Sequence, residues 1–286
     1  MRARLTATQV AQAFRDACLA ELDALKPGNV HRFGDDPRTS VSDFETSARV
    51  AAPPLAKAGA SVGARIRASV AATIDAVGHN TNLGIILLSA PLASAALSDE
   101  AGDLRKRLAK VLAGLSVEDA REAYEAIRQA NPGGLGDVPR HDVDSEPTVT
   151  LLEAMKAAEG HDRIAWNYSH DFADIFELGL MRLKEAAKRG WPSPLATTAA
   201  YLGFLSTIPD TLIVRKFGGP QALEVQAEAK ALAARLNDSA DPGAVEPELK
   251  DFDRSLKARG LNPGTSADLT VATLLAASIQ ALEQRR

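Results

Sequence analysis

Apolar side chains recur every three or four residues along most of the chain, as in Val225, Leu232 and Leu236. This spacing is typical of helices with one buried face. Strand-like alternation is nearly absent, and aromatic residues make up only 5% of the sequence. The pattern predicts an all-α fold, a single compact domain of roughly a dozen helices over residues 1–286. The expected helices span residues 6–25, 42–58, 61–77, 83–97, 99–114, 116–130, 148–158, 161–188, 194–206, 210–216, 220–237, 245–258 and 266–283.

Local signals place some of the helix ends. Thr6 with Gln9 and Ser42 with Glu45 have the spacing of capping boxes, and Ser116 begins an imperfect one. The long segment 161–188 is expected to break near Tyr168. Residues 131–147 are rich in Pro and Gly and predict one long irregular loop.

Composition and charge narrow the class of protein. A net charge of −4 argues against a broad nucleic-acid-binding face. The longest apolar run, residues 84–97, is too short to span a bilayer and contains Pro91, so we expect a buried core helix and no membrane segment. The single cysteine, Cys18, excludes an internal disulfide and fits a reducing cytoplasm. The Ala-rich helices would also allow a homodimer.

Four polar segments interrupt the helical pattern, and we term them polar islands. They are residues 26–34, 78–84, 209–219 and 262–268, and each lies at the edge of an expected helix. Pro and Gly shape tight turns in three of them, next to amides, hydroxyls and cations. Helix ends and cations of this kind bind anions. The islands therefore predict one site that is assembled from four helix ends.

The islands supply the candidate ligands. Asp210 and Asp268 are candidate Mg²⁺ ligands, because Mg²⁺ needs one or two carboxylates when a phosphate completes its shell. Either Asp could instead be a helix cap, and Arg215 and Lys216 could be a solvated face. No Walker A or Rossmann motif is present. The candidate substrate-binding residues are Lys26, Gly28, Asn29, Arg32, Asn80, Thr81, Asn82, Arg215, Lys216, Asn262, Gly264 and Ser266.

At these islands the chain resembles the triphosphoribosyl-dephospho-CoA synthase family. That family has a Lys-Pro-Gly loop, an Asn-Thr-His-Lys-Gly segment, an Asp-Thr-Asn segment followed by Arg, and an Asn-x-x-Pro-Gly-x-Ser-Ala-Asp segment. Residues 26–28, 80–84, 210–215 and 262–268 match these segments fully or in part, in the same order.

The resemblance implies a transferase with ATP or a related nucleotide as donor and a small molecule as acceptor. The bond between adenine and ribose C1′ breaks, and the triphosphoribosyl unit moves to an acceptor hydroxyl. The transition state would resemble that of glycoside cleavage, which nearby carboxylates stabilise. Glu21, His31 and Asp210 are the candidate catalytic residues, although the sequence does not assign the proton-transfer roles. Mg²⁺ is the expected cofactor.

Two departures from the family pattern alter the site. The His-Lys pair is replaced by Asn82-Leu83, and the Asn after Asp-Thr by Leu212. The chain resembles a branch found in archaea and methylotrophic bacteria, for which one hypothesis is a role in tetrahydromethanopterin or related C1-cofactor biosynthesis. The alternatives are a metal-dependent hydrolase of ribosyl or phosphate esters and a non-catalytic nucleotide-binding protein. All three require the four islands to meet in one pocket.

Overall fold

The computed structural model describes residues 5–34, 40–132 and 142–285. Regular structure in these ranges is helical, apart from one isolated bridge between His31 and Gly34, and the predicted all-α fold is confirmed. The α-helices are α1 (Ala7–Leu22), α2 (Val41–Leu55), α3 (Val62–Val77), α4 (Leu83–Leu97), α5 (Leu104–Ala113), α6 (Val117–Ala130), α7 (Leu151–Ala158), α8 (Arg163–Ser169), α9 (Leu180–Lys188), α10 (Ser193–Thr207), α11 (Thr211–Phe217), α12 (Gly219–Asp238), α13 (Glu246–Ala258) and α14 (Gly264–Gln284).

Capping side chains explain where several helices begin. The boxes predicted at Thr6 and Ser116 are both present. The box predicted at Ser42 is wrong, because Ser40 accepts the N–H of Asp43 and α2 begins at Val41, one residue before the predicted start. Helix α5 begins later than predicted, since Asp103 accepts the N–H of Lys106 and sets the helix start there.

The predicted break near Tyr168 is confirmed, and the backbone explains it. Helix α8 ends at Ser169, and Asp171 and Phe172 then take left-handed φ angles of 48° and 54°. A π-helix, Asp174–Gly179, follows before α9. Side chains rarely adopt this left-handed region, so two such residues in succession end the helix and redirect the chain.

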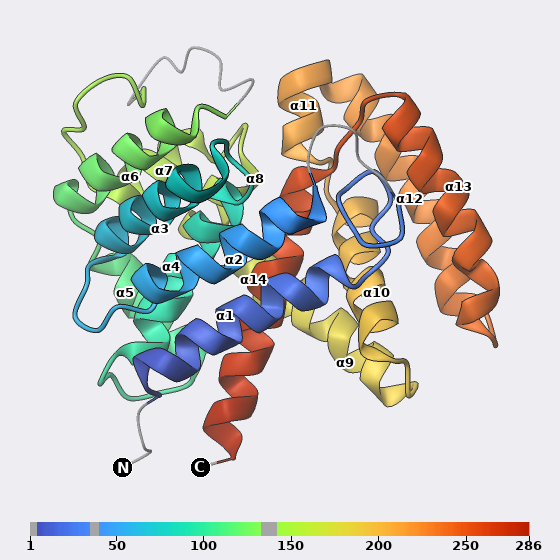
Figure 1. Ribbon diagram of the computed structural model, residues 1–286, viewed down its shortest axis with the longest axis horizontal. Helices are drawn as coiled ribbons and strands as arrows, with labels where there is room; N and C mark the ends of the chain where they lie inside the picture. Colours follow the sequence, from blue (N-terminus) through green and yellow to red (C-terminus); the bar gives the residue numbers. More distant parts are fainter. Residues whose placement is uncertain (1–4, 35–39, 133–141, 286) are drawn as a thin grey trace.

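Helix α14 runs through the middle of the molecule (Figure 1). It packs against α1, α4, α10 and the π-helix. By length and composition α14 could cross a membrane, but 61% of its apolar window is buried inside the protein. A buried, apolar helix of this length is the central helix of a globular core.

Buried hydrophobic side chains form two clusters, one on either side of helix α14. The larger draws on α1 to α8 and α14, and the smaller on α10 to α13. In Figure 1, α3, α4, α6, α7 and α8 lie to the left of α14, and α10 to α13 lie to the right. The loops that carry the polar islands lie where these two halves meet.

Candidate active site

A cavity of about 770 Å³ lies at the junction of the two halves. Residues from all four polar islands line it, so the expectation that the islands meet in one pocket is confirmed. The predicted site residues on its wall are Glu21, Gly28, Asn29, Asn80, Thr81, Asn82, Arg215, Lys216, Asn262, Gly264 and Asp268.

The first island is bonded to the fourth and to α13. The Asn29 side-chain amide donates to Asn262 Oδ1 at 2.8 Å. The Gly28 N–H donates to Asp253 Oδ1, also at 2.8 Å. Gly28 has a φ of 80°, and a Cβ there would lie 2.9 Å from the carbonyl oxygen of Leu261. The Pro-Gly turn therefore brings the backbone close to the fourth island in a way that only glycine permits.

Lys26 and Glu21 form a buried ion pair at the base of the cavity. Lys26 is fully buried, and its ammonium donates to Glu21 Oε1, to Asn29 Oδ1 at 3.0 Å and to the Val30 carbonyl at 2.7 Å. All three ammonium protons are thus used within the protein. Burial lowers the pKa of Lys26 and raises that of Glu21. Glu21 lines the cavity but Lys26 does not, so Lys26 positions Glu21 and Asn29, and the phosphate contact predicted for it has no support.

Asp210 joins α11 to α14 and does not line the cavity. Its Oδ1 accepts the N–H groups of Leu212 and Ile213 and caps α11. Its Oδ2 accepts the N–H and the hydroxyl of Ser266, at 2.8 and 2.9 Å. Both carboxylate oxygens are thus engaged, which leaves the predicted metal and catalytic roles of Asp210 and the ligand contact of Ser266 without support. The alternative interpretation, a helix cap, describes Asp210 instead.

His31 and Arg32 also lie outside the cavity wall. His31 is buried, its Nδ1 accepts the N–H of Phe33, and its Nε2 lies 3.2 Å from Asp253. Burial lowers the pKa of His31, and its two ring nitrogens face Phe33 and Asp253. Arg32 is paired at 2.6 Å with both Asp23 and Glu45 near the surface. The predicted catalytic role of His31 and substrate contact of Arg32 therefore have no support.

The second island begins α4. Asn80 Oδ1 accepts the N–H groups of Asn82 and Leu83 at 3.2 and 3.0 Å, and the Thr81 hydroxyl pairs with Ser47 at 2.7 Å. Asn82 is only 5% exposed, yet its side-chain NH₂ has no partner in the part of the chain that the structure describes. Asn82 lines the cavity, as does the first turn of α4, whose N–H groups have no acceptor within the helix itself.

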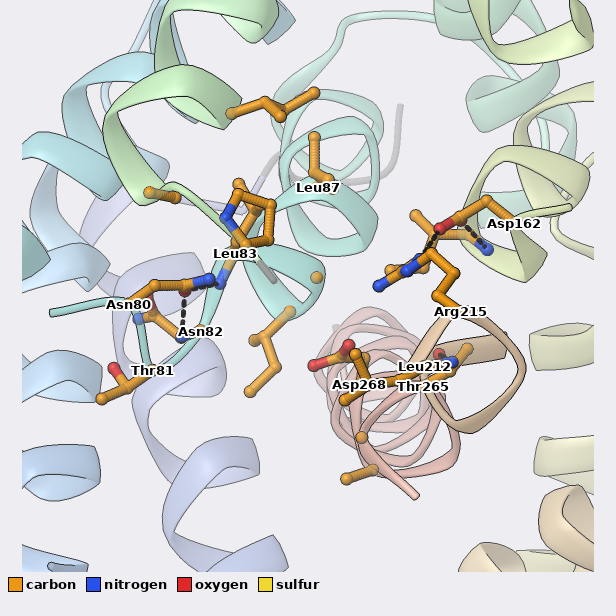
Figure 2. A pocket seen from close by; sticks show the side chains of 18 of the residues that line it. Asn80, Thr81, Asn82, Leu83, Leu87, Asp162, Leu212, Arg215, Thr265 and Asp268 are labelled. Carbon is orange, nitrogen blue, oxygen red and sulfur yellow. Dashed lines mark hydrogen bonds and ion pairs between the residues drawn. The ribbon is translucent and has the colours of Figure 1, made fainter. Parts of the chain in front are cut away.

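The third island contributes Arg215 and Lys216. One Nη of Arg215 is bound to Asp162, which also caps α8 through its other oxygen. The Arg215 Nε is buried and unpaired within the described ranges. Figure 2 shows Asn80 and Asn82 on one side of the cavity, Asp162 and Arg215 on the other, and Asp268 between them.

The carboxylate of Asp268 lies at the centre of this arrangement. Among residues 5–34, 40–132 and 142–285, none donates a hydrogen bond to it. A Cβ on Gly84 would lie 2.0 Å from Asp268 Oδ2, so the carboxylate rests against the first turn of α4. Burial, with repulsion from Asp210 and Glu21, holds the pKa of Asp268 well above its usual range. A carboxyl group in this state readily accepts a cation or a proton donor.

The side chains of the cavity suit a metal ion that arrives with a phosphate ligand. No cluster of three or more His, Cys, Asp or Glu side chains with metal-site geometry exists within the described residues. Asp268 supplies one carboxylate to the cavity, and Asn80, Asn82 and Asn262 line the same cavity. Mg²⁺ commonly binds to one or two carboxylates together with substrate phosphates and waters.

Sequence reasoning missed three contributors to the cavity. Lys257 lies on the wall, four residues after Asp253, to which it is paired at 3.0 Å. Asp162 was missed because an Asp at a helix N-cap is explained by capping alone, and the sequence does not show that it also binds Arg215. The apolar wall from α6, α7 and α8 was also missed, since its residues follow the ordinary helical pattern of a core.

Comparison with known proteins shows the family and the fold of the chain. Residues 7–286 match the CitG family model, described as ATP:dephospho-CoA triphosphoribosyl transferase. No curated protein matches the chain. A crystal structure from Archaeoglobus fulgidus, described provisionally as a triphosphoribosyl-dephospho-CoA synthase, superposes with a TM-score of 0.65 at 24% identity. The match covers 82% of this chain and 97% of that one, and it shows a shared fold. Because the family model spans almost the whole sequence, the chain belongs to the ATP:dephospho-CoA triphosphoribosyl transferase family.

Proposed function

We propose that the junction cavity binds ATP with Mg²⁺ and that its polar wall holds the triphosphate while C1′ is transferred. Membership of the family makes the chain a transferase of a phosphoribosyl unit derived from ATP. The observation that carries the assignment to this cavity is Asp268: it has no hydrogen-bond donor among the described residues, and it lies between Arg215, Asn82 and the first turn of α4.

The donors around Asp268 match a polyphosphate. Within the described residues Arg215 has an unused Nε and Asn82 has an unused NH₂. The N–H groups in the first turn of α4 have no acceptor within the helix itself. Lys216 and Lys257 add positive charge to the same wall. The carboxylate of Asp268 would by itself repel a phosphate. A Mg²⁺ ion held by Asp268 would place a positive charge between the two negative groups and attract both. Mg²⁺ would supply charge neutralisation on the triphosphate.

Glu21 is the residue that we assign to proton transfer. Lys26 fixes one of its oxygens, and the side chain lines the cavity. Burial raises the pKa of Glu21, which suits a general base. The acceptor oxygen forms a bond to C1′ as the C1′–N9 bond breaks, the electron pair stays on adenine, and the hydroxyl proton passes to Glu21. Adenine leaves and the triphosphate remains attached to the transferred ribose.

Calorimetric titration of ATP tests this assignment. Wild-type protein should bind ATP more tightly with Mg²⁺ than without it. Arg215→Ala should weaken binding by about tenfold or more, because a charge-assisted hydrogen bond contributes about 1.5–3 kcal/mol. The control, Arg235→Ala, removes an exposed arginine of α12 and should leave the affinity unchanged. Equal affinity with and without Mg²⁺, together with an unaltered Arg215→Ala variant, would refute the proposed donor site.

Where the enzyme works and which pathway it serves stay predictions. ATP as substrate is consistent with the expected cytoplasmic location. The role in C1-cofactor biosynthesis that the resemblance implies would need the acceptor to be identified.

A further inference from the structure

One part of the cavity wall is lined largely by apolar side chains. We call this part the apolar chamber. It lies among α3, α4, α6, α7 and α8, and its only buried polar side chain within the described residues is that of Tyr124. Figure 2 shows Leu83 and Leu87 of α4 on this part of the wall. The chamber is lined by Ile74, Leu83, Leu87, Tyr124, Ile127, Ala130, Leu151, Ala154, Met155, Ala158, Ile164 and Ala165.

The triphosphate donor cannot account for this surface. Phosphates require the polar wall, and a purine carries ring nitrogens and an amino group that need partners. The chamber walls are the flanks of helices, whose backbone N–H and C=O groups are already bonded within each helix. A purine there would leave polar atoms unpaired, which is unfavourable in a buried site. The chamber therefore suits a group with few polar atoms.

Two apolar residues of the polar islands lie on the wall of the same cavity. Leu83 is the first residue of α4, and Leu212 lies in the first turn of α11. Both residues line the cavity, and Leu83 is 8% exposed. In this chain they extend the apolar surface toward the reacting centre.

We infer that the acceptor is an alcohol whose bulky apolar body occupies the apolar chamber while its hydroxyl points to Glu21 and Asp268. This inference rests on the proposed donor site and adds the class of the second substrate. The cavity volume of about 770 Å³ is within the range of sites that hold sizeable ligands, about 300–1,000 Å³. Burial of the apolar body supplies the binding free energy, and the single hydroxyl selects the reacting atom.

The test uses 2-(2-naphthyl)ethanol as a bulky apolar alcohol, with ribitol as a polar alcohol and dephospho-CoA as an anionic acceptor. Binding of each to wild-type protein is measured by calorimetry, and adenine release from ATP with Mg²⁺ is measured by chromatography. The naphthyl alcohol should bind more tightly than ribitol by about tenfold or more. It should also stimulate adenine release more than dephospho-CoA does.

Two variants test whether the naphthyl alcohol binds in the apolar chamber. Ala158→Phe fills part of the chamber, and Leu83→Lys places a cation at its edge. Each should weaken binding of the naphthyl alcohol by about tenfold, for different physical reasons. Ala157→Phe changes the adjacent, exposed residue of α7, which is not on the cavity wall, and is expected to leave the affinity within twofold. Circular dichroism and thermal unfolding check that each variant is folded.

The outcomes separate the two proposals. If ATP binds with Mg²⁺ but the naphthyl alcohol does not bind, the apolar acceptor is refuted and the donor site stands. The same conclusion follows if the naphthyl alcohol binds to both chamber variants as tightly as to wild-type protein. Stimulation of adenine release by dephospho-CoA alone also refutes the apolar acceptor and leaves the donor site standing. If the alcohol binds and ATP does not, the donor site is refuted, and the acceptor role of the chamber is refuted with it.

Discussion

At the scale of single residues, two aspartates with the same sequence signal have different surroundings. Asp210 and Asp268 each lie near a helix start inside a polar island, and both were candidate metal ligands. Four hydrogen bonds satisfy Asp210, whereas Asp268 has none from the described residues. The sequence could not separate them, because the partners of Asp210 include Ser266, which is 56 residues away.

The partly buried carboxyl of Asp268 should lower the stability of the free protein. Burial raises its pKa in the folded state, so at neutral pH the unfolded chain loses this proton more readily than the folded chain. Its contribution to stability is thus fully present at low pH and is lost as pH rises toward the raised pKa. Asp268→Asn should increase the free energy of unfolding by on the order of 1 kcal/mol at pH 8 and by little at pH 4.

Urea unfolding at the two pH values checks this prediction. The control is Asp238→Asn, which changes an exposed residue at the end of α12 and should alter stability by less than about 0.5 kcal/mol. A loss of stability in Asp268→Asn at pH 8 would contradict the raised pKa and indicate that the carboxylate is a structural group.

At the scale of elements, the hydrophobic pattern predicted the helices well, and local caps decided most of their starts. The predicted break near Tyr168 is present, where α8 ends at Ser169. The errors came from competition between nearby cap residues, as with Ser40 and Ser42. How the helices pack depends on contacts between distant segments, so the apolar chamber could not be located from the sequence, although the islands that form the polar wall were grouped correctly.

The junction of α11 and α14 should depend on Asp210. Asp210→Ala removes a helix cap and both bonds to Ser266, so we expect a loss of about 3 kcal/mol in the free energy of unfolding. Asp103→Ala is the matched control, because it removes an exposed cap of α5 that has no contact of this kind with another helix, and should lose only about 1 kcal/mol. Equal losses in the two variants would show that the bonds to Ser266 do not hold α11 to α14.

At the scale of the whole molecule, the active-site cavity is a product of the two packed halves. The left half supplies the apolar chamber, the right half supplies Arg215 and Lys257, and α14 between them carries Asp268. Each half has its own buried hydrophobic cluster, which gives the site rigid walls. A donor held between Arg215 and the first turn of α4 would meet an acceptor held in the apolar chamber, beside Glu21 and Asp268.

The most direct measurement is the identity of the product that ATP yields. Wild-type protein is incubated with ATP, Mg²⁺ and the acceptors described above, and the mixture is resolved by chromatography for adenine, ADP and phosphate. We predict free adenine that requires Mg²⁺, no release of phosphate, and a loss of about 100-fold or more in rate in Asp268→Asn, on the scale of removing a main electrostatic contact to the transition state. ADP or phosphate in place of adenine, or full activity in Asp268→Asn, would contradict the proposed transfer at C1′.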